Sequence, residues 1–200
     1  MPAGKEYQVR PTLIVDTREQ TPLIFRHLAF ERGTLTTGDY SFAGGEEVFA
    51  IERKTIADLT ACCVGDNRER FERELHRLRG FQFARLLIVG CEAEVTTHRY
   101  RGNINPKAVL HTVRAFEARY VPMVWEPSPE KAATLVEQWA FWFAREVAKT
   151  AERVLAGSRD QAPSPTGQES GATPDANMEK LQTTSRPGPQ STGSFGAAAM

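Results

Sequence analysis

The chain has 200 residues, 40% of them hydrophobic, which is enough for one domain with a real core plus an appendage. Its 25 basic residues balance 25 acidic ones, and this excludes the bulk positive field of a histone-like DNA binder. The chain opens without an apolar signal segment and contains no membrane-length apolar run. We therefore expect a soluble intracellular protein without membrane contacts, in the cytoplasm or nucleoid of a prokaryote or the nucleus of a eukaryote.

Several short apolar runs in the chain are typical of strands. The first, TLIVD at 12–16, ends at an acid, and the stretches TLTTGDYSF at 34–42 and EVFAIERK at 47–54 are separated by two glycines. This arrangement predicts a hairpin in the middle of the sheet. RLLIVG at 85–90 predicts a further buried strand, and YVPMVW at 120–125 predicts an edge strand.

Three helices are expected between and after these strands. Asp66 and Glu69 have capping-box spacing, and Phe71, Leu75 and Leu78 follow at helical spacing, which predicts a helix from about 67 to 79. A second helix should begin after Asn105-Pro106, and a third after Ser128-Pro129. Together these elements predict an α/β domain whose mixed β-sheet is flanked by helices on both faces.

The composition changes sharply near Gly157. From there to Met200, Gly, Pro, Ser and Thr dominate, and the segment holds no Val, Ile, Trp or Tyr. Such a segment buries too little apolar surface to offset its ordering entropy. We therefore expect a folded domain over 1–156 and a disordered tail over 157–200.

Three acids stand at the ends of predicted strands. Because side chains alternate along a strand, Glu52 and Lys54 should share one face, whereas Ile51 and Arg53 should share the other. Asp16 closes the first strand, and Asp39 follows a glycine where the chain turns. If Asp16, Asp39 and Glu52 converge at one edge of the sheet, they repel one another unless a cation binds there.

A cluster of carboxylate ligands suits Mg²⁺ or Mn²⁺. Such an ion lowers the pKa of water and polarises a phosphoryl oxygen, and the charge of Lys54 would help where the transition state becomes more negative. The chemistry that this pattern indicates is the hydrolysis of a phosphodiester.

The three segments that carry these residues match a narrower pattern. VDTRE at 15–19, GDY at 38–40 and ERKTIAD at 52–58 together resemble the XPF-type (ERCC4-domain) structure-specific endonucleases, a branch of the PD-(D/E)xK nucleases with a restriction-endonuclease-like fold. The resemblance implies that Asp39 and Glu52 are metal ligands and that Lys54 is the catalytic lysine. It also implies that Arg53 is an essential charge near the site, Asp16 a further ligand or a contact to metal-bound water, and Asp58 a supporting acid.

The resemblance further implies a DNA substrate that is branched, such as a flap or fork in repair or recombination, with phosphate contacts from Arg18, Arg68 and Arg70. Family members pair through their nuclease domains, so a homodimer or heterodimer is expected, and the aromatic stripe of Trp139, Trp142 and Phe143 is either core or part of that seam.

Simpler structural roles remain open for several of these residues. Asp58 has the spacing to cap a helix that starts after Thr55, and Asp39 fits a turn residue after glycine. Arg18 and Glu19 suit surface ion pairs with each other or with the next strand, and the mixed charges around Arg68 suit a solvated helix face.

The sequence departs from the family where a helix-hairpin-helix module usually follows the nuclease domain, because residues 157–200 carry no second apolar pattern. It also has no Walker-type phosphate loop, so ATP use is not expected. The alternative to a nuclease is a non-catalytic DNA-binding or scaffolding subunit, as some relatives have become. The intact Asp39, Glu52 and Lys54 favour the nuclease.

Overall fold

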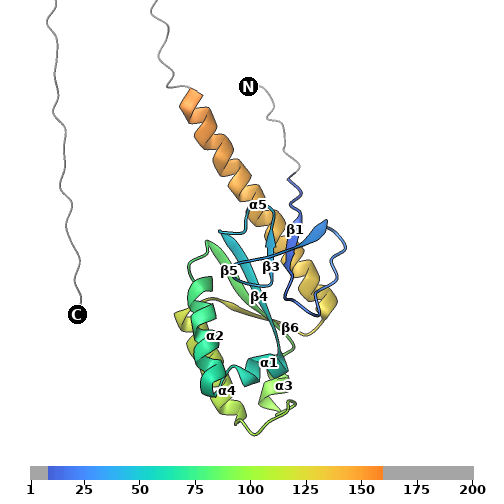
Figure 1. Ribbon diagram of the computed structural model, residues 1–200, viewed down its shortest axis with the longest axis vertical. Helices are drawn as coiled ribbons and strands as arrows, with labels where there is room; N and C mark the ends of the chain where they lie inside the picture. The colour runs from blue at the N-terminus through green and yellow to red at the C-terminus, as the bar shows by residue number, and fades with distance from the viewer. Residues whose placement is uncertain (1–8, 160–200) are drawn as a thin grey trace, which may run out of the picture. The chain divides into compact units, whose positions relative to one another are not determined.

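The computed structural model describes residues 9–159, which form a sheet with helices on both of its faces (Figure 1). The strands of the sheet are β1 (Leu13–Asp16), β2 (Phe30–Gly33), β3 (Tyr40–Phe42), β4 (Phe49–Thr55), β5 (Phe83–Val89) and β6 (Met123–Glu126). Their order is β2-β1-β3-β4-β5-β6. Within the described range β3 runs antiparallel to both neighbours, and the other paired strands run parallel. The sheet is therefore mixed, as predicted.

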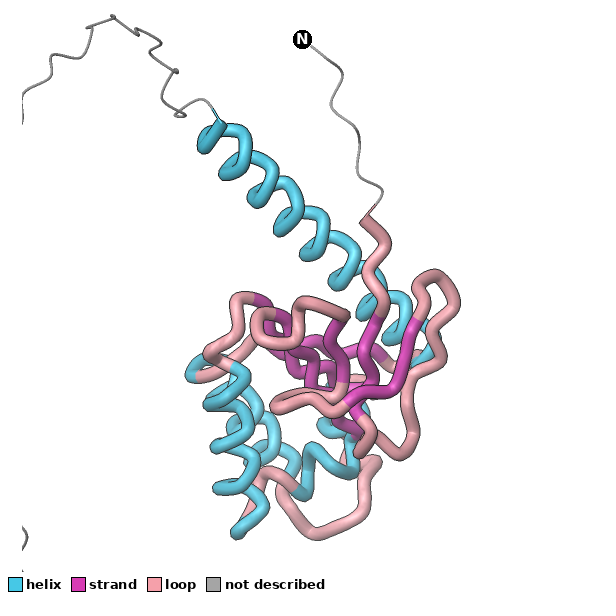
Figure 2. The backbone as a smooth tube through the Cα atoms, turned by 45° about the horizontal axis from the view of Figure 1, so that its top comes forward, coloured by secondary structure: helices cyan, strands magenta, loops and turns pink. Residues whose placement is uncertain are grey.

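The helices follow or separate these strands, and Figure 2 shows them as coils around the strands. They are α1 (Ile56–Ala61), α2 (Gly65–Leu78), α3 (Glu92–Thr96), α4 (Pro106–Arg119) and α5 (Pro129–Arg159). Asn105 caps α4 by accepting from the backbone N–H of Lys107, and Pro106 occupies the first turn, where its missing N–H has no cost.

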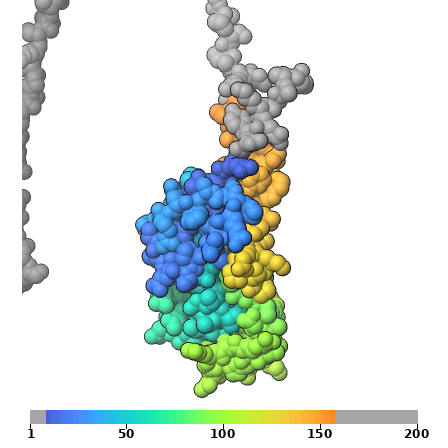
Figure 3. Space-filling model, turned by 90° about the vertical axis from the view of Figure 1, so that its right-hand side faces the viewer, coloured from blue at the N-terminus to red at the C-terminus, as the bar shows by residue number. Residues whose placement is uncertain are grey.

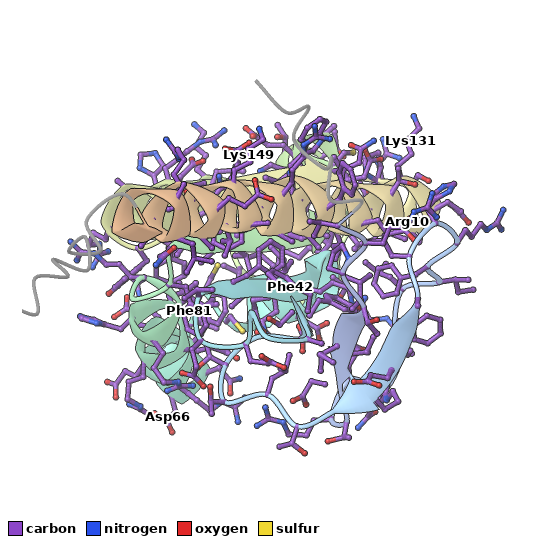
Figure 4. The ribbon with its side chains drawn as sticks, turned by 90° about the horizontal axis from the view of Figure 1, so that it is seen from above. Arg10, Phe42, Asp66, Phe81, Lys131 and Lys149 are labelled. Atoms are coloured by element: carbon purple, nitrogen blue, oxygen red, sulfur yellow. The ribbon has the colours of Figure 1, made fainter. Side chains whose placement is uncertain are left out.

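Alternation along the strands divides the core into two layers. On one face, Ala50 and Leu86 pack with apolar residues of α1, α2, α3 and α4, among them Phe71 and Phe116. On the other face, Phe49 and Ile51 pack against α5. In Figure 4, Phe42 lies between the sheet and α5, and its ring is 6.2 Å from that of Phe143. The expected cover on both faces of the sheet is confirmed.

The predicted elements are present with shifted ends, and two short elements were not predicted. The helix expected from 67 begins at Gly65, and its N-cap is Val64, which makes no side-chain cap bond, so Asp66 lies in the first turn rather than capping it. There its charge still favours the helix dipole. Strand β2 reads FERG and lies mostly exposed at the sheet edge, and α3 has five residues, so neither carries a hydrophobic period.

Helix α5 is the longest element and continues past 156 to Arg159. Its first half covers the sheet, whereas from Glu146 to Gly157 nearly every residue is exposed, and Figure 1 shows this end projecting beyond the sheet. Most of the tail predicted over 157–200 lies outside the described residues, so its boundary stays a prediction. Within 9–159, no helix combines the length and apolar character needed to cross a membrane.

Candidate active site

One edge of the sheet gathers the charged ends of three strands. Strands β1 and β4 run in the same direction, and β3 runs oppositely between them. The end of β1, the start of β3 and the end of β4 therefore meet at this edge. A cleft of about 370 Å³ opens there, which we call the β4 cleft; it is lined by Arg18, Glu19, Gln20, Thr21, Asp39, Glu52, Arg53, Lys54, Asp58, Ala61, Cys62, Asn67 and Arg70.

Asp39 reaches the cleft because of the glycine before it. Gly38 has φ of +84°, and a Cβ there would lie 3.1 Å from the carbonyl oxygen of Ile51, so a larger residue fits neither the conformation nor the space. Asp39 follows directly, and its Oδ2 accepts from the backbone N–H of Arg53 at 2.8 Å. This bond holds the carboxylate beside the last residues of β4.

Glu52 and Lys54 share the face of β4 that points toward α2, as strand alternation predicted. The ammonium of Lys54 donates to Glu52 Oε1, lies 3.8 Å from Glu74 Oε2, and sits 5.1 Å from the centre of the Phe71 ring. Glu52 is 3% exposed. The lysine is therefore held between two acids and an aromatic face.

Asp39 and Glu52 together carry more negative charge than the neighbouring cation compensates. Burial, reinforced by the charges of Glu19 and Glu74, raises the pKa of Asp39 to about 6. Burial and the neighbouring Asp39 raise the pKa of Glu52 well above its usual value. Burial opposes the charge of Lys54, yet Glu52 and Glu74 raise its pKa, so the lysine stays a cation. One ammonium does not compensate both carboxylates.

Arg53 points to the opposite face of β4 and forms a different network. Its Nη2 donates to Glu19 Oε1 at 3.0 Å and to Thr21 Oγ1 at 2.9 Å, and Glu19 Oε1 also accepts from the backbone N–H of Thr21 at 2.8 Å. Although burial disfavours its charge, Glu19 has a lowered pKa because Arg53 and Thr21 hydrogen-bond to it. Glu19 therefore forms its ion pair with Arg53 of β4.

Asp16 lies at the same edge but does not line the β4 cleft. Its carboxylate accepts from the backbone N–H and the guanidinium of Arg18 and from the backbone N–H of Leu35. These bonds outweigh burial and lower the pKa of Asp16. The expected cluster of three acids is therefore not formed, because the lone pairs of Asp16 are engaged by Arg18 and Leu35.

Asp58 caps a helix and also lies at the wall of the β4 cleft. Thr55 Oγ1 accepts from the backbone N–H of Asp58 at 3.2 Å and donates to its Oδ2 at 2.7 Å, so the pair caps α1. Asp58 also lines the cleft.

Two of the three arginines expected to contact DNA, Arg68 and Arg70, lie on the same helix but point in different directions. Arg70 lines the cleft. Arg68 instead lies over the Phe116 ring of α4 at 5.4 Å and pairs with Glu72, so it packs α2 against α4. Two residues along a helix amount to more than half a turn, and this explains the separation.

The carboxylates of the β4 cleft form a small oxygen donor set. Within residues 9–159, no three side chains of Asp, Glu, His or Cys come together as a metal cluster. Asp39 and Glu52 nevertheless place two carboxylates in one cleft, and a cation there would offset the repulsion from neighbouring acids that helps to raise their pKa values. Mg²⁺ is commonly held by one or two carboxylates plus waters and substrate phosphates, so this pair fits it.

Glu74 was not predicted as a site residue, although it lies within 3.8 Å of Lys54. A signal was present, because Glu74 follows Phe71 by three positions and thus shares the side of α2 that packs toward the sheet.

Known proteins resemble the chain in sequence and fold. A sequence model of the ERCC4 domain matches residues 15–138, and no curated protein matches the chain. XPF from Aeropyrum pernix is 21% identical with a TM-score of 0.52, and the match covers 65% of this chain and 60% of that one. XPF from Aeropyrum pernix in complex with DNA is 19% identical with a TM-score of 0.52, and the match covers 71% and 66%.

The two solved structures establish the fold, and this chain spans about 60% and 66% of their lengths. The sequence match covers more than half of the chain and includes Asp39, Glu52, Lys54 and Asp58. The fold and the ordered motifs thus agree with the resemblance drawn from the sequence. The chain belongs to the ERCC4 domain family.

Proposed function

We propose that this protein is a divalent-metal-dependent endonuclease that hydrolyses phosphodiester bonds in DNA, with Mg²⁺ or Mn²⁺ as its cofactor. The observation that carries the proposal is the meeting of Asp39, Glu52 and Lys54 in the β4 cleft. Membership of the ERCC4 domain family supports a nuclease that acts on DNA.

Asp39 and Glu52 are the proposed ligands. A divalent cation bound there would supply positive charge to the scissile phosphate and lower the pKa of a water molecule. Asp39 is positioned by the N–H of Arg53, and Glu52 by its place in the core of β4. We do not include Asp16 among the proposed ligands, because its carboxylate is paired with Arg18.

Lys54 is the proposed catalytic lysine. Its ammonium is the charge that the structure places beside Glu52, and it stays protonated at neutral pH. A fixed cation at this point stabilises the phosphoryl oxygens as they gain negative charge in the transition state. Contacts with Phe71 and Glu74 restrict the conformations of the Lys54 side chain.

Arg53 and Asp58 support the site from either side. Arg53 ties the end of β4 to Glu19 and Thr21, and Asp58 fixes the turn from β4 into α1.

Arg18 and Arg70 line the cleft and are the proposed phosphate contacts. Such contacts position DNA without reading its sequence, which suits branched, flap or fork substrates in repair or recombination.

We also propose that the nuclease domains pair, with a second copy of the chain seated on α5. Helix α5 exposes Trp142, and its projecting end exposes Val147, Val154 and Leu155, along which a hollow of about 610 Å³ runs. An exposed apolar stripe of this kind marks an interaction surface.

The test is the mass in solution of wild type and Val147→Glu, measured by light scattering. We expect wild type to be a dimer and the variant a monomer, and an unchanged mass in the variant would oppose the assignment.

The test of function is incubation of the full chain with labelled flap, fork, nicked and linear duplexes in Mg²⁺, Mn²⁺ or EDTA. Cleavage that requires the cation and is lost in Asp39→Asn is expected. The matched control is Glu126→Gln, because Glu126 ends a parallel strand, β6, yet does not line the cleft. DNA binding without cleavage in any cation would instead favour a non-catalytic scaffolding subunit.

A further inference from the structure

A second hollow lies directly beside the β4 cleft. Its volume is about 290 Å³, and we call it the Ile24 hollow; it is lined by Thr21, Pro22, Leu23, Ile24, Arg26, Arg53, Val89, Pro129 and Glu130. Thr21 and Arg53 line both spaces, so these two side chains form the wall between them. Whatever occupies the β4 cleft therefore has a neighbouring space one side chain away.

The hollow is built from a loop that is held at both ends. We call residues 21–28 the 21–28 loop. At its start, the Thr21 hydroxyl accepts a hydrogen bond from Arg53, and the N–H of Leu23 donates to the Tyr40 hydroxyl at 3.1 Å.

At its other end, the buried Glu137 of α5 accepts from the backbone N–H groups of Arg26, His27 and Leu28. Figure 3 shows this N-terminal part of the surface, in blue, beside the yellow surface of α5.

Ile24 points outward from this fixed loop. It is 75% exposed, whereas Leu23 and Phe25 on either side are each 6% exposed. The buried neighbours anchor the backbone, so binding at the exposed side chain needs little further ordering of the backbone. An isoleucine held in this way beside a cleft for DNA provides a surface on which a base can rest.

The chemistry of the hollow favours a base over a phosphate. Most of its wall is apolar, from Pro22, Leu23, Ile24, Val89 and Pro129. Its charged side chains are Arg26, Arg53 and Glu130, and Arg53 is already paired with Glu19, which leaves the donor Arg26 and the acceptor Glu130. A carboxylate repels a phosphate, whereas the edge of a nucleobase offers both donors and acceptors and its faces are apolar.

We propose that the Ile24 hollow is a subsite for one unstacked nucleobase of the DNA strand whose backbone lies in the β4 cleft. The inference rests on the proposed function, because it assumes that DNA enters that cleft. It adds a source of substrate selectivity. A base in intact duplex must be unpaired and unstacked before it can enter the hollow. A base that is already unpaired enters at a lower free-energy cost.

The test is a set of fork substrates that each carry one abasic nucleotide, stepped through the unpaired strand and across the junction. Binding is measured in EDTA with the full chain, for wild type, Ile24→Ala and the control Phe30→Ala. Phe30 serves as the control because it is also an exposed apolar side chain, 53% exposed on β2, and lines neither space.

At one position, the abasic nucleotide should weaken binding to wild type by roughly tenfold, which is the usual worth of a stacked base. Ile24→Ala should weaken binding to the intact fork similarly, and the two changes together should cost little more than either alone. Phe30→Ala should behave as wild type does. Cleavage rates in Mg²⁺ should follow the same pattern.

Fully additive effects, or no position at which the abasic nucleotide matters, would overturn the subsite and leave the nuclease proposal standing if cleavage persists. Failure to cleave, with the abasic effect still abolished by Ile24→Ala, would overturn the nuclease and support the subsite. A change in oligomeric mass in Ile24→Ala, without a change in DNA binding, would make the hollow a protein contact and reject the proposal.

Discussion

Two pairs of acids lie at the same edge of the sheet and have opposite environments. Asp16 and Glu19 are buried but engaged by Arg18, Leu35 and Arg53, and their pKa values are lowered. Asp39 and Glu52 share a single ammonium, and their pKa values are raised. The first pair is satisfied within the protein, whereas the second is not.

The difference separates acids whose charge the fold compensates from acids whose charge it leaves uncompensated. A carboxylate whose hydrogen bonds are made by the fold stabilises it, and removal of that carboxylate leaves buried donors unpaired. A carboxylate held near another without compensation costs stability and suits a cation or a proton. Substitutions in the two pairs should therefore have opposite consequences.

The largest effect is expected from loss of either unsatisfied acid. Asp39→Asn or Glu52→Gln should lower the cleavage rate on the order of 10³-fold or more, because a metal contribution worth several kcal/mol is lost. Circular dichroism should show an intact fold. Single-turnover cleavage of a fork in Mg²⁺ is the measurement, and a variant that cuts within tenfold of wild type would remove that acid from the site.

Loss of the lysine between the acids should have the next largest effect. Lys54→Ala should lower the cleavage rate roughly 10²-fold or more, because a preorganised charge is missing in the transition state. DNA affinity in EDTA should change much less. Equal losses in rate and affinity would instead make Lys54 a phosphate-binding residue.

The satisfied pair should respond in stability rather than in rate. Glu19→Gln should lower the free energy of unfolding by about 1–3 kcal/mol, because Arg53 loses its charged partner while partly buried. Cleavage per folded molecule should fall far less than in Asp39→Asn. Urea denaturation measures the stability. An unchanged midpoint would contradict the claim that the two pairs of acids differ in how they affect stability.

Much of this arrangement was predictable from local patterns. Strand alternation placed Glu52 and Lys54 together and Arg53 on the opposite face, and the hairpin brought Asp39 beside β4. Both the mixed sheet and the helix cover followed from the order of apolar runs. These features depend on short-range periodicity, which the sequence displays directly.

Other parts depend on side-chain choices that periodicity does not contain. Asp16 ends its strand like a ligand, yet a turn of two residues brings Arg18 back to it. Arg68 and Arg70 are alike in sequence, but only the packing of α4 shows that Arg68 lies over Phe116. Strand β2 reads FERG and pairs with β1 at an exposed edge, so it carries no apolar signal.

The dependence of stability on pH, in wild type and Asp39→Asn, tests the contrast most directly. An acid with a raised folded pKa destabilises the protein as pH rises from its unfolded pKa of 3.8 through about 6. The contributions of Asp16 and Glu19 are lost only on acidification, through their lowered folded pKa values, so they are constant above about pH 5.

In EDTA, Asp39→Asn should therefore be more stable than wild type at pH 7.5, by roughly 1–3 kcal/mol, with the difference shrinking toward pH 5. Addition of Mn²⁺ should stabilise wild type and close the difference, because a bound cation favours the charged carboxylates. Equal stability of the two proteins at every pH, or equal stabilisation of both by Mn²⁺, would contradict the account.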